Sequence, residues 1–203
     1  AAANALRECR DALPGGRGAA KEAERAERVA TLQRLFRGVL GRFVDVCRPA
    51  QRKYNVAVAV AAGKFNEAIV VETRQCAVDC IRYLRDARLG SALFLPLDGI
   101  DPPRADERLR SLGPGYHLAV DVVQCDAAVA KAVAYAVGAT VVCDDLDGAR
   151  RLCYGPDADG RPPVKAVTLK GAQIAKSGTI TGGAYGSGAE TTSGDRKSTR
   201  LNS

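Results

Sequence analysis

The sequence contains no methionine and no tryptophan, and aromatic residues make up only 5% of its 203 positions. Because position 1 is alanine rather than methionine, we expect the chain to be a piece of a longer protein. The single histidine is His117. No GxSxG or comparable nucleophile motif accompanies it, so we expect His117 to be structural and the chain itself not to be an enzyme.

The seven cysteines form no CxxC motif. Their odd number and scattered positions favour free thiols in a reducing compartment. Cys76 and Cys80 lie one helical turn apart and could supply two ligands to a metal ion. No second pair at a suitable spacing completes a set of four ligands. We therefore expect buried thiols here and no metal.

Long apolar runs are also missing, since the longest one, 56–62, has seven residues. Such a run is too short to span a bilayer, and the N-terminus lacks the pattern of a signal peptide. We expect no membrane contact. The acidic clusters at 144–148 and 157–160 resemble pieces of a calcium loop but lack its first Asp and its closing Glu. They favour a helix N-terminus and a polar turn instead.

The net charge of +7 is concentrated at the N-terminal end. Residues 1–53 hold 12 basic and 6 acidic residues, whereas residues 54–180 hold 15 of each. One hypothesis is therefore a weak, sequence-independent contact with DNA, and the alternative is a solvated helix face. The candidate residues for the DNA contact are Arg34, Arg37, Arg42, Arg48, Arg52 and Lys53.

A glycine-rich segment, 176–183 (KSGTITGG), could cradle a phosphate through its backbone N–H groups. Its spacing matches neither GxxxxGK[ST] nor GxGxxG, and no helix is predicted directly after it. The motif spacings also argue against a small Rossmann-like enzyme, so we expect no cofactor and no small-molecule substrate. Glycine permits close backbone approach, which favours an interface or a tight turn.

Helix and strand patterns alternate along the chain. Thr73 is expected to cap a helix running to about Arg88, with Ala77, Cys80, Ile81 and Leu84 on its inner face. Asp144 is expected to cap another helix. The predicted helices are 21–36, 49–62, 73–88, 126–137 and 144–153, and the predicted strands are 67–71, 118–123, 140–143 and 164–169. This alternation predicts mixed or parallel sheets with helices packed on them.

Read in order, short segments of the chain resemble the hinge of SMC (structural maintenance of chromosomes) proteins, particularly that of the first SMC subunit of cohesin. The segments are 41–49 (GRFVDVCRP), 53–54 (KY), 63–64 (GK), 68–71 (AIVV), 79–84 (DCIRYL), 94–98 (FLPLD), 119–123 (AVDVV), 135–138 (YAVG), 141–144 (VVCD), and 176–178 (KSG) with 181–183 (TGG).

The resemblance implies an α+β fold with two mixed-sheet subdomains, flanked by a remnant of a coiled-coil arm. It implies a dimerisation module that pairs with another SMC hinge, here that of the third SMC subunit of cohesin, to close a ring that holds DNA. The ATPase head of the family would lie elsewhere in the full-length protein. The expected location is the nucleus, on chromosomes. The family's dimer contact maps onto Gly178, Thr181, Gly182 and Gly183.

We expect three segments: the end of an incoming arm at 1–40, helical but interrupted at 14–16 (PGG), the hinge at 41–184, and a disordered or non-native tail at 185–203. The family differs at Arg37, where it usually has Pro, and at Lys170, where Asp is common. After Gly183 the family resumes a charged helix, whereas this chain continues into Gly, Ser and Thr.

Overall fold

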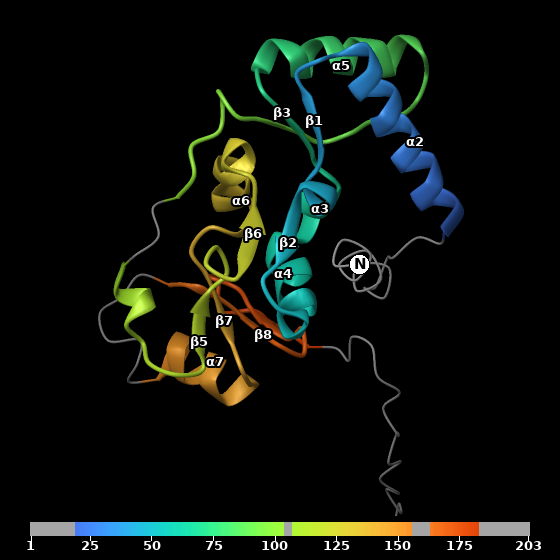
Figure 1. Ribbon diagram of the computed structural model, residues 1–203. Coiled ribbons are helices and arrows are strands. Elements are labelled where there is room, and N and C mark those ends of the chain that lie inside the picture. Colours follow the sequence, from blue (N-terminus) through green and yellow to red (C-terminus); the bar gives the residue numbers. More distant parts are fainter. Residues whose placement is uncertain (1–18, 104–106, 156–162, 183–203) are drawn as a thin grey trace, which may run out of the picture.

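The computed structural model describes residues 19–103, 107–155 and 163–182. Two mixed sheets, separated by a layer of helices, organise these residues (Figure 1). The predicted residues 1–18 of the arm and the tail after residue 182 lie outside the described part. The prediction of two mixed sheets with packed helices is confirmed.

The first sheet has three strands in the order β1-β3-β4. β1 (Val39–Arg42) runs antiparallel to β3 (Ile69–Val71), and β3 runs parallel to β4 (Phe94–Pro96). Helices α2 (Ala19–Leu35) and α5 (Arg74–Asp86) cover one face of this sheet. Their shared core is apolar: Val29, Leu32, Val39, Ile69, Val71, Ala77, Cys80 and Leu84.

Five strands form the second sheet, in the order β10-β9-β8-β7-β5. They are β5 (Tyr116–Leu118), β7 (Thr140–Cys143), β8 (Lys165–Thr168), β9 (Gln173–Ile174) and β10 (Ile180–Thr181). Only β7 and β8 are parallel. Because side chains alternate along a strand, Val142 and Val167 face the central layer while Val141 and Ala166 face α7 (Leu146–Tyr154).

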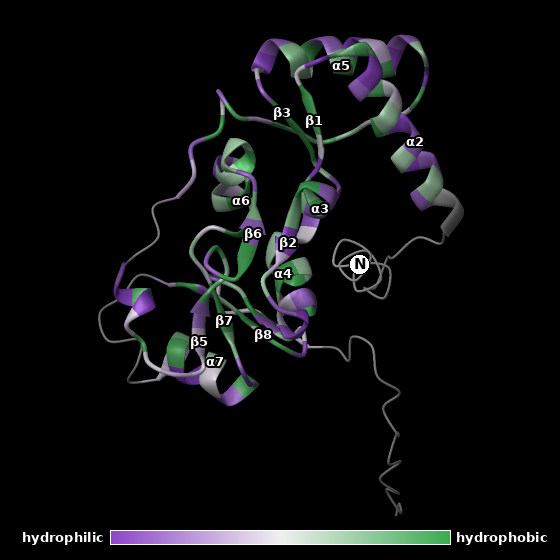
Figure 2. Ribbon diagram, in the orientation of Figure 1, coloured by the Kyte–Doolittle hydropathy of each residue, from purple (hydrophilic) through white to green (hydrophobic). Residues whose placement is uncertain are grey.

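The central layer contains α3 (Phe43–Val46), α4 (Asn55–Ala62) and α6 (Ala130–Val137), with short 3₁₀ turns at Arg52–Tyr54, Gly63–Glu67 and Ala127–Val129. The sequence of α4, NVAVAVAA, is apolar on all sides because both sheets cover it. A two-stranded ladder of β2 (Cys47–Pro49) and β6 (Val123–Cys125) joins the two halves of the chain. Figure 2 shows apolar strands between helices that are polar on their outer turns.

Several predicted boundaries are wrong for local reasons. Pro49 ends strand β2 instead of starting a helix. Of the predicted strand 118–123, Leu118 ends β5, Val123 begins β6, and residues 119–122 form the turn between them. Asp145, not Asp144, caps α7. Ile81 is 50% exposed rather than on the inner face of α5. In contrast, the Thr73 cap is confirmed, with its side chain accepting from the Cys76 N–H.

Candidate dimerisation edge

The glycine-rich segment forms a hairpin at the edge of the five-stranded sheet. β9 and β10 pair antiparallel, with Ile174 opposite Ile180 and Gln173 opposite Thr181. In the turn between them, the N–H of Ala175 donates to the Thr179 carbonyl at 2.8 Å. Since β10 is last in the sheet, its outer edge has no strand partner within the described residues. The segment is thus a tight turn followed by a strand edge that is open within the described residues; of these two features, the sequence predicted the tight turn, as one of two uses of the glycines.

The local backbone requires glycine at one position of this hairpin but not at another. Gly178 has φ of 86°, a conformation that side-chain-bearing residues rarely adopt, and its N–H closes the turn onto the Ala175 carbonyl. Gly182 has no such requirement, because an added Cβ would meet no described atom within 4 Å and its φ is unexceptional. Nothing in this chain's described fold therefore requires glycine at 182.

The exposed side of the hairpin carries an apolar residue. Ile180 is 49% exposed, and Thr181 and Gly182 are exposed beside it. Helix α7 holds the turn in place, since the Tyr154 hydroxyl donates to the Gly178 carbonyl. Gly178, Thr181 and Gly182 thus lie together on one exposed edge. Gly183, the fourth predicted contact residue, lies outside the described residues.

The predicted basic residues divide into two groups. Arg34 and Arg37 are exposed around the end of α2, while Arg48, Arg52 and Lys53 are exposed along β2 and the turn that follows. These segments lie at opposite ends of the β1–α3–β2 path in Figure 1. The two groups of basic residues are therefore separated along the chain by β1 and α3.

The prediction that Arg42 contacts DNA is wrong, because its side chain is only 2% exposed. Its Nε donates to Asp45 Oδ2 at 2.7 Å, and its Nη1 lies 2.8 Å from Glu22 Oε1. Burial by itself lowers the pKa of Arg42, but the hydrogen bonds and charges of Asp45 and Glu22 outweigh it and raise the pKa overall. A guanidinium enclosed by carboxylates at the root of α2 is not available to a phosphate backbone.

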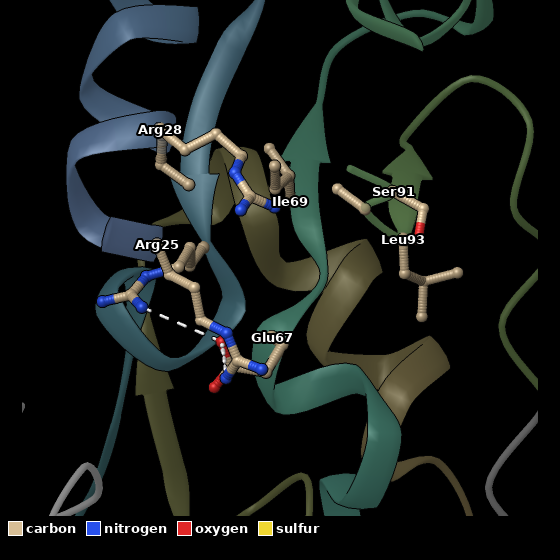
Figure 3. A pocket seen from close by; sticks show the side chains of 9 residues that line it. Arg25, Arg28, Glu67, Ile69, Ser91 and Leu93 are labelled. Carbon is tan, nitrogen blue, oxygen red and sulfur yellow. Dashed lines mark ion pairs between the residues drawn. The ribbon is translucent and has the colours of Figure 1, made fainter. Parts of the chain in front are cut away.

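The same junction encloses a small cavity of about 130 Å³ between α2 and the three-stranded sheet. Figure 3 shows Arg25 and Arg28 projecting from α2 toward Glu67 and β3. Arg25 pairs with Glu67 at 3.1 Å. Arg42 lies on the cavity wall 3.8 Å from the same carboxylate. The Arg42–Asp45 pair has a helical spacing that the sequence could have revealed, whereas Glu22 and Glu67 are too distant in sequence to be inferred as its partners.

The remaining candidates from the sequence have structural roles. Cys80 is buried beside Cys76, and burial, with Cys76 as a further cause, raises its pKa to about 12. Among residues 19–103, 107–155 and 163–182, no group of three or more metal-ligating side chains occurs. His117 lies in β5 and packs edge-on against the Tyr54 ring. No helix within those ranges is both long and apolar enough to cross a membrane.

A family model described as "SMC proteins Flexible Hinge Domain" matches residues 36–153. This chain belongs to the SMC hinge family. The match covers more than half of the chain. The part of SMC proteins that it identifies is the hinge, which is not catalytic. The matched residues end before β9 and β10, so the role of the glycine hairpin stays a prediction.

Curated relatives extend the similarity to most of the chain. It is 43% identical over 166 residues to Structural maintenance of chromosomes protein 1 of Arabidopsis thaliana, covering 82% of this chain and 13% of that protein. The Schizosaccharomyces pombe protein of the same name is 39% identical over 163 residues, covering 80% of this chain and 13% of its own length. The chain therefore spans about an eighth of these relatives.

Solved hinge structures share the fold. An asymmetric dimer of the Geobacillus stearothermophilus SMC hinge domain has a TM-score of 0.70 at 32% identity, over 81% of this chain and 66% of that one. A structure of the folded elbow of cohesin has a TM-score of 0.68 at 34% identity, over 83% of this chain and 24% of that one.

Proposed function

We propose that this hinge dimerises with another SMC hinge through the open edge of β10. The observation that carries the proposal is Gly182, which is exposed, unstrained and free of neighbours within the described fold, yet lacks a side chain. Ile180 adds apolar surface to the same edge. The hinge of Geobacillus stearothermophilus forms a dimer in its crystal structure, which supports the same role here.

The geometry fits strand addition. The outward N–H and C=O groups along β10, which have no strand partner among the residues that the structure describes, can pair with an edge strand of a partner and so extend a sheet across the interface. β10 is short, as expected of an edge that must not pair indiscriminately. The absence of a side chain at Gly182 lets the partner's backbone approach closely.

The partner we infer is the hinge of the third SMC subunit of cohesin. The similarity to SMC protein 1 of several eukaryotes and to a cohesin structure supports this choice. In this proposal the two hinges close one end of a ring that holds DNA in sister-chromatid cohesion and chromosome organisation, and the protein acts on chromosomes in the nucleus.

The test is a light-scattering mass measurement of the chain, alone and mixed with the hinge of cohesin's third SMC subunit. We expect a one-to-one complex. Gly182→Glu should weaken it at least tenfold, because a charged side chain would hold the partner's backbone away from β10. The matched control is Ala127→Glu. It adds the same charge at an exposed position, the start of the 3₁₀ turn that precedes α6.

If Gly182→Glu and Ala127→Glu bind equally well, β10 is not the contact. If the folded chain stays monomeric in the mixture, the partner assignment fails. Titration of duplex DNA over a range of salt concentrations then tests the alternative role of the exposed basic residues, since phosphate contacts give a linear fall of log K with log salt.

A further inference from the structure

Two cysteines face each other across the ladder that joins the two halves of the chain. In the β2–β6 pair, Cys47 lies directly opposite Cys125, and Pro49 lies opposite Val123. Residues opposite one another in an antiparallel pair project to the same face of the ladder. Both thiols are free.

The hydrogen-bond pattern fixes the kind of pair that they form. Just beyond the ladder, the Ala50 N–H donates to the Val122 carbonyl at 2.8 Å, which makes these opposite residues a hydrogen-bonded pair. Such pairs alternate along antiparallel strands with non-hydrogen-bonded pairs. Counting back, Pro49 and Val123 are a non-hydrogen-bonded pair, which suits a proline without an N–H. Two residues further, Cys47 and Cys125 are again a non-hydrogen-bonded pair.

This position brings two cysteines within bonding range. Cα atoms of a non-hydrogen-bonded pair lie about 4.5 Å apart, inside the range of roughly 4.4–6.8 Å that a disulfide requires. Burial raises the pKa of the Cys47 thiol to about 12, with the neighbouring Cys125 as the next cause, in keeping with their closeness.

We propose that Cys125 and Cys47 form a thiol pair that a small-molecule disulfide converts to a cross-strand disulfide, locking β2 to β6. Cys125 is exposed at the end of β6, whereas Cys47 is completely buried. The exposed thiol therefore meets the oxidant first, and the buried one completes the reaction.

The chemistry balances in two exchange steps. Cys125 gives up its proton, and its thiolate attacks one sulfur of oxidised glutathione; this forms a mixed disulfide and releases a glutathione thiolate, which takes up that proton. Cys47, whose thiol donates to the Phe43 carbonyl at 3.0 Å, then gives up its proton and attacks the Cys125 sulfur, releasing the second glutathione thiol. Two protein thiols are oxidised, and one glutathione disulfide is reduced.

The test treats the full chain with excess oxidised glutathione at mildly alkaline pH, blocks the remaining thiols and maps the peptides by mass spectrometry without reduction. We expect a linked peptide pair containing Cys47 and Cys125 as the main product, and a higher midpoint of thermal unfolding that dithiothreitol reverses. Cys153→Ser, which removes a partly buried thiol outside the β2–β6 ladder, should leave the link unchanged.

Two cysteine variants separate the two exchange steps. Cys47→Ala should trap glutathione on Cys125, and Cys125→Ser, at an exposed position that tolerates the change, should abolish the link. The proposal is overturned if the unaltered chain keeps glutathione on Cys125 without linking to Cys47. It is equally overturned if Cys125 remains unmodified while Cys153 reacts.

Discussion

Arg42 shows how a single residue can be misread from sequence. It stands among basic residues that looked like a DNA contact, but the fold places it under α2 with carboxylates on three sides. Its function in this structure is to tie the helical arm to the three-stranded sheet. Charge counting could not separate it from its exposed neighbours, because burial depends on contacts with Glu22 and Glu67.

Replacing Arg42 by Met should be strongly destabilising. Glu22, whose side chain is 16% exposed, would lose its ion pair with Arg42, and removing one partner of a buried ion pair costs several kcal/mol. Allowing for the partial exposure of Glu22 and Asp45, we expect a loss of about 2–3 kcal/mol in urea unfolding.

Arg25→Met is the matched control for that change. Arg25 also pairs with Glu67, but its side chain is 30% exposed, so we expect a loss below about 1 kcal/mol. Equal losses for the two variants would contradict the assignment of Arg42 as the buried anchor of the arm.

At the scale of elements, the start of α7 was predicted one residue too early. Asp144 and Asp145 are both suitable caps by composition, and only the backbone conformation decides between them. Asp145 is extended and its Oδ1 accepts from the Gly148 N–H at 2.6 Å. The N–H of Asp144 instead donates to the Gly115 carbonyl, which extends the β5–β7 pairing.

Asp145→Ala should therefore cost about 1 kcal/mol of unfolding free energy, as is usual for the loss of an N-cap. Asp144→Ala should cost less than half as much, since its side chain caps nothing. Chemical denaturation of both variants measures the difference. The reverse order would show that Asp144 caps the helix, as the sequence pattern alone indicated.

Strands buried on both faces were the easiest elements to predict. The strand 140–143 was placed correctly because TVVC is a short apolar run bounded by a glycine and an acidic pair. The β2–β6 ladder was missed, since Pro49 resembles a helix start and the run AVDVV contains a turn. For the candidate edge, the glycine-rich segment itself indicated an interface or a tight turn, and the family resemblance indicated a dimer contact. The hydrogen bond from Tyr154 required the fold.

At the scale of the whole molecule, one apolar cluster connects the two sheets. Val70 of the first sheet and Val167 of the second belong to the same core, with α4 between them. The sheets are therefore coupled through the central helices and should unfold together.

Val58→Ala in α4 tests this coupling. Val58 is 1% exposed, so its truncation should cost about 2 kcal/mol. Hydrogen exchange should report the same loss for the amides of β3 and of β7. The control is Val78→Ala in α5. Val78 is 40% exposed, so its truncation should cost under about 0.5 kcal/mol. A loss confined to one sheet would mean that the two subdomains unfold independently.

The first sheet uses residues 39–96 and the second uses residues 116–181, so during synthesis the first can pair before the second has been made. β2 differs, because its partner β6 ends only at residue 125. At roughly 5–20 residues per second, the interval between residues 96 and 125 lasts about 1.5–6 s on the ribosome. During that time the nascent chain presents an unpaired strand, and a translational pause there would prolong its exposure to chaperones and to other nascent chains.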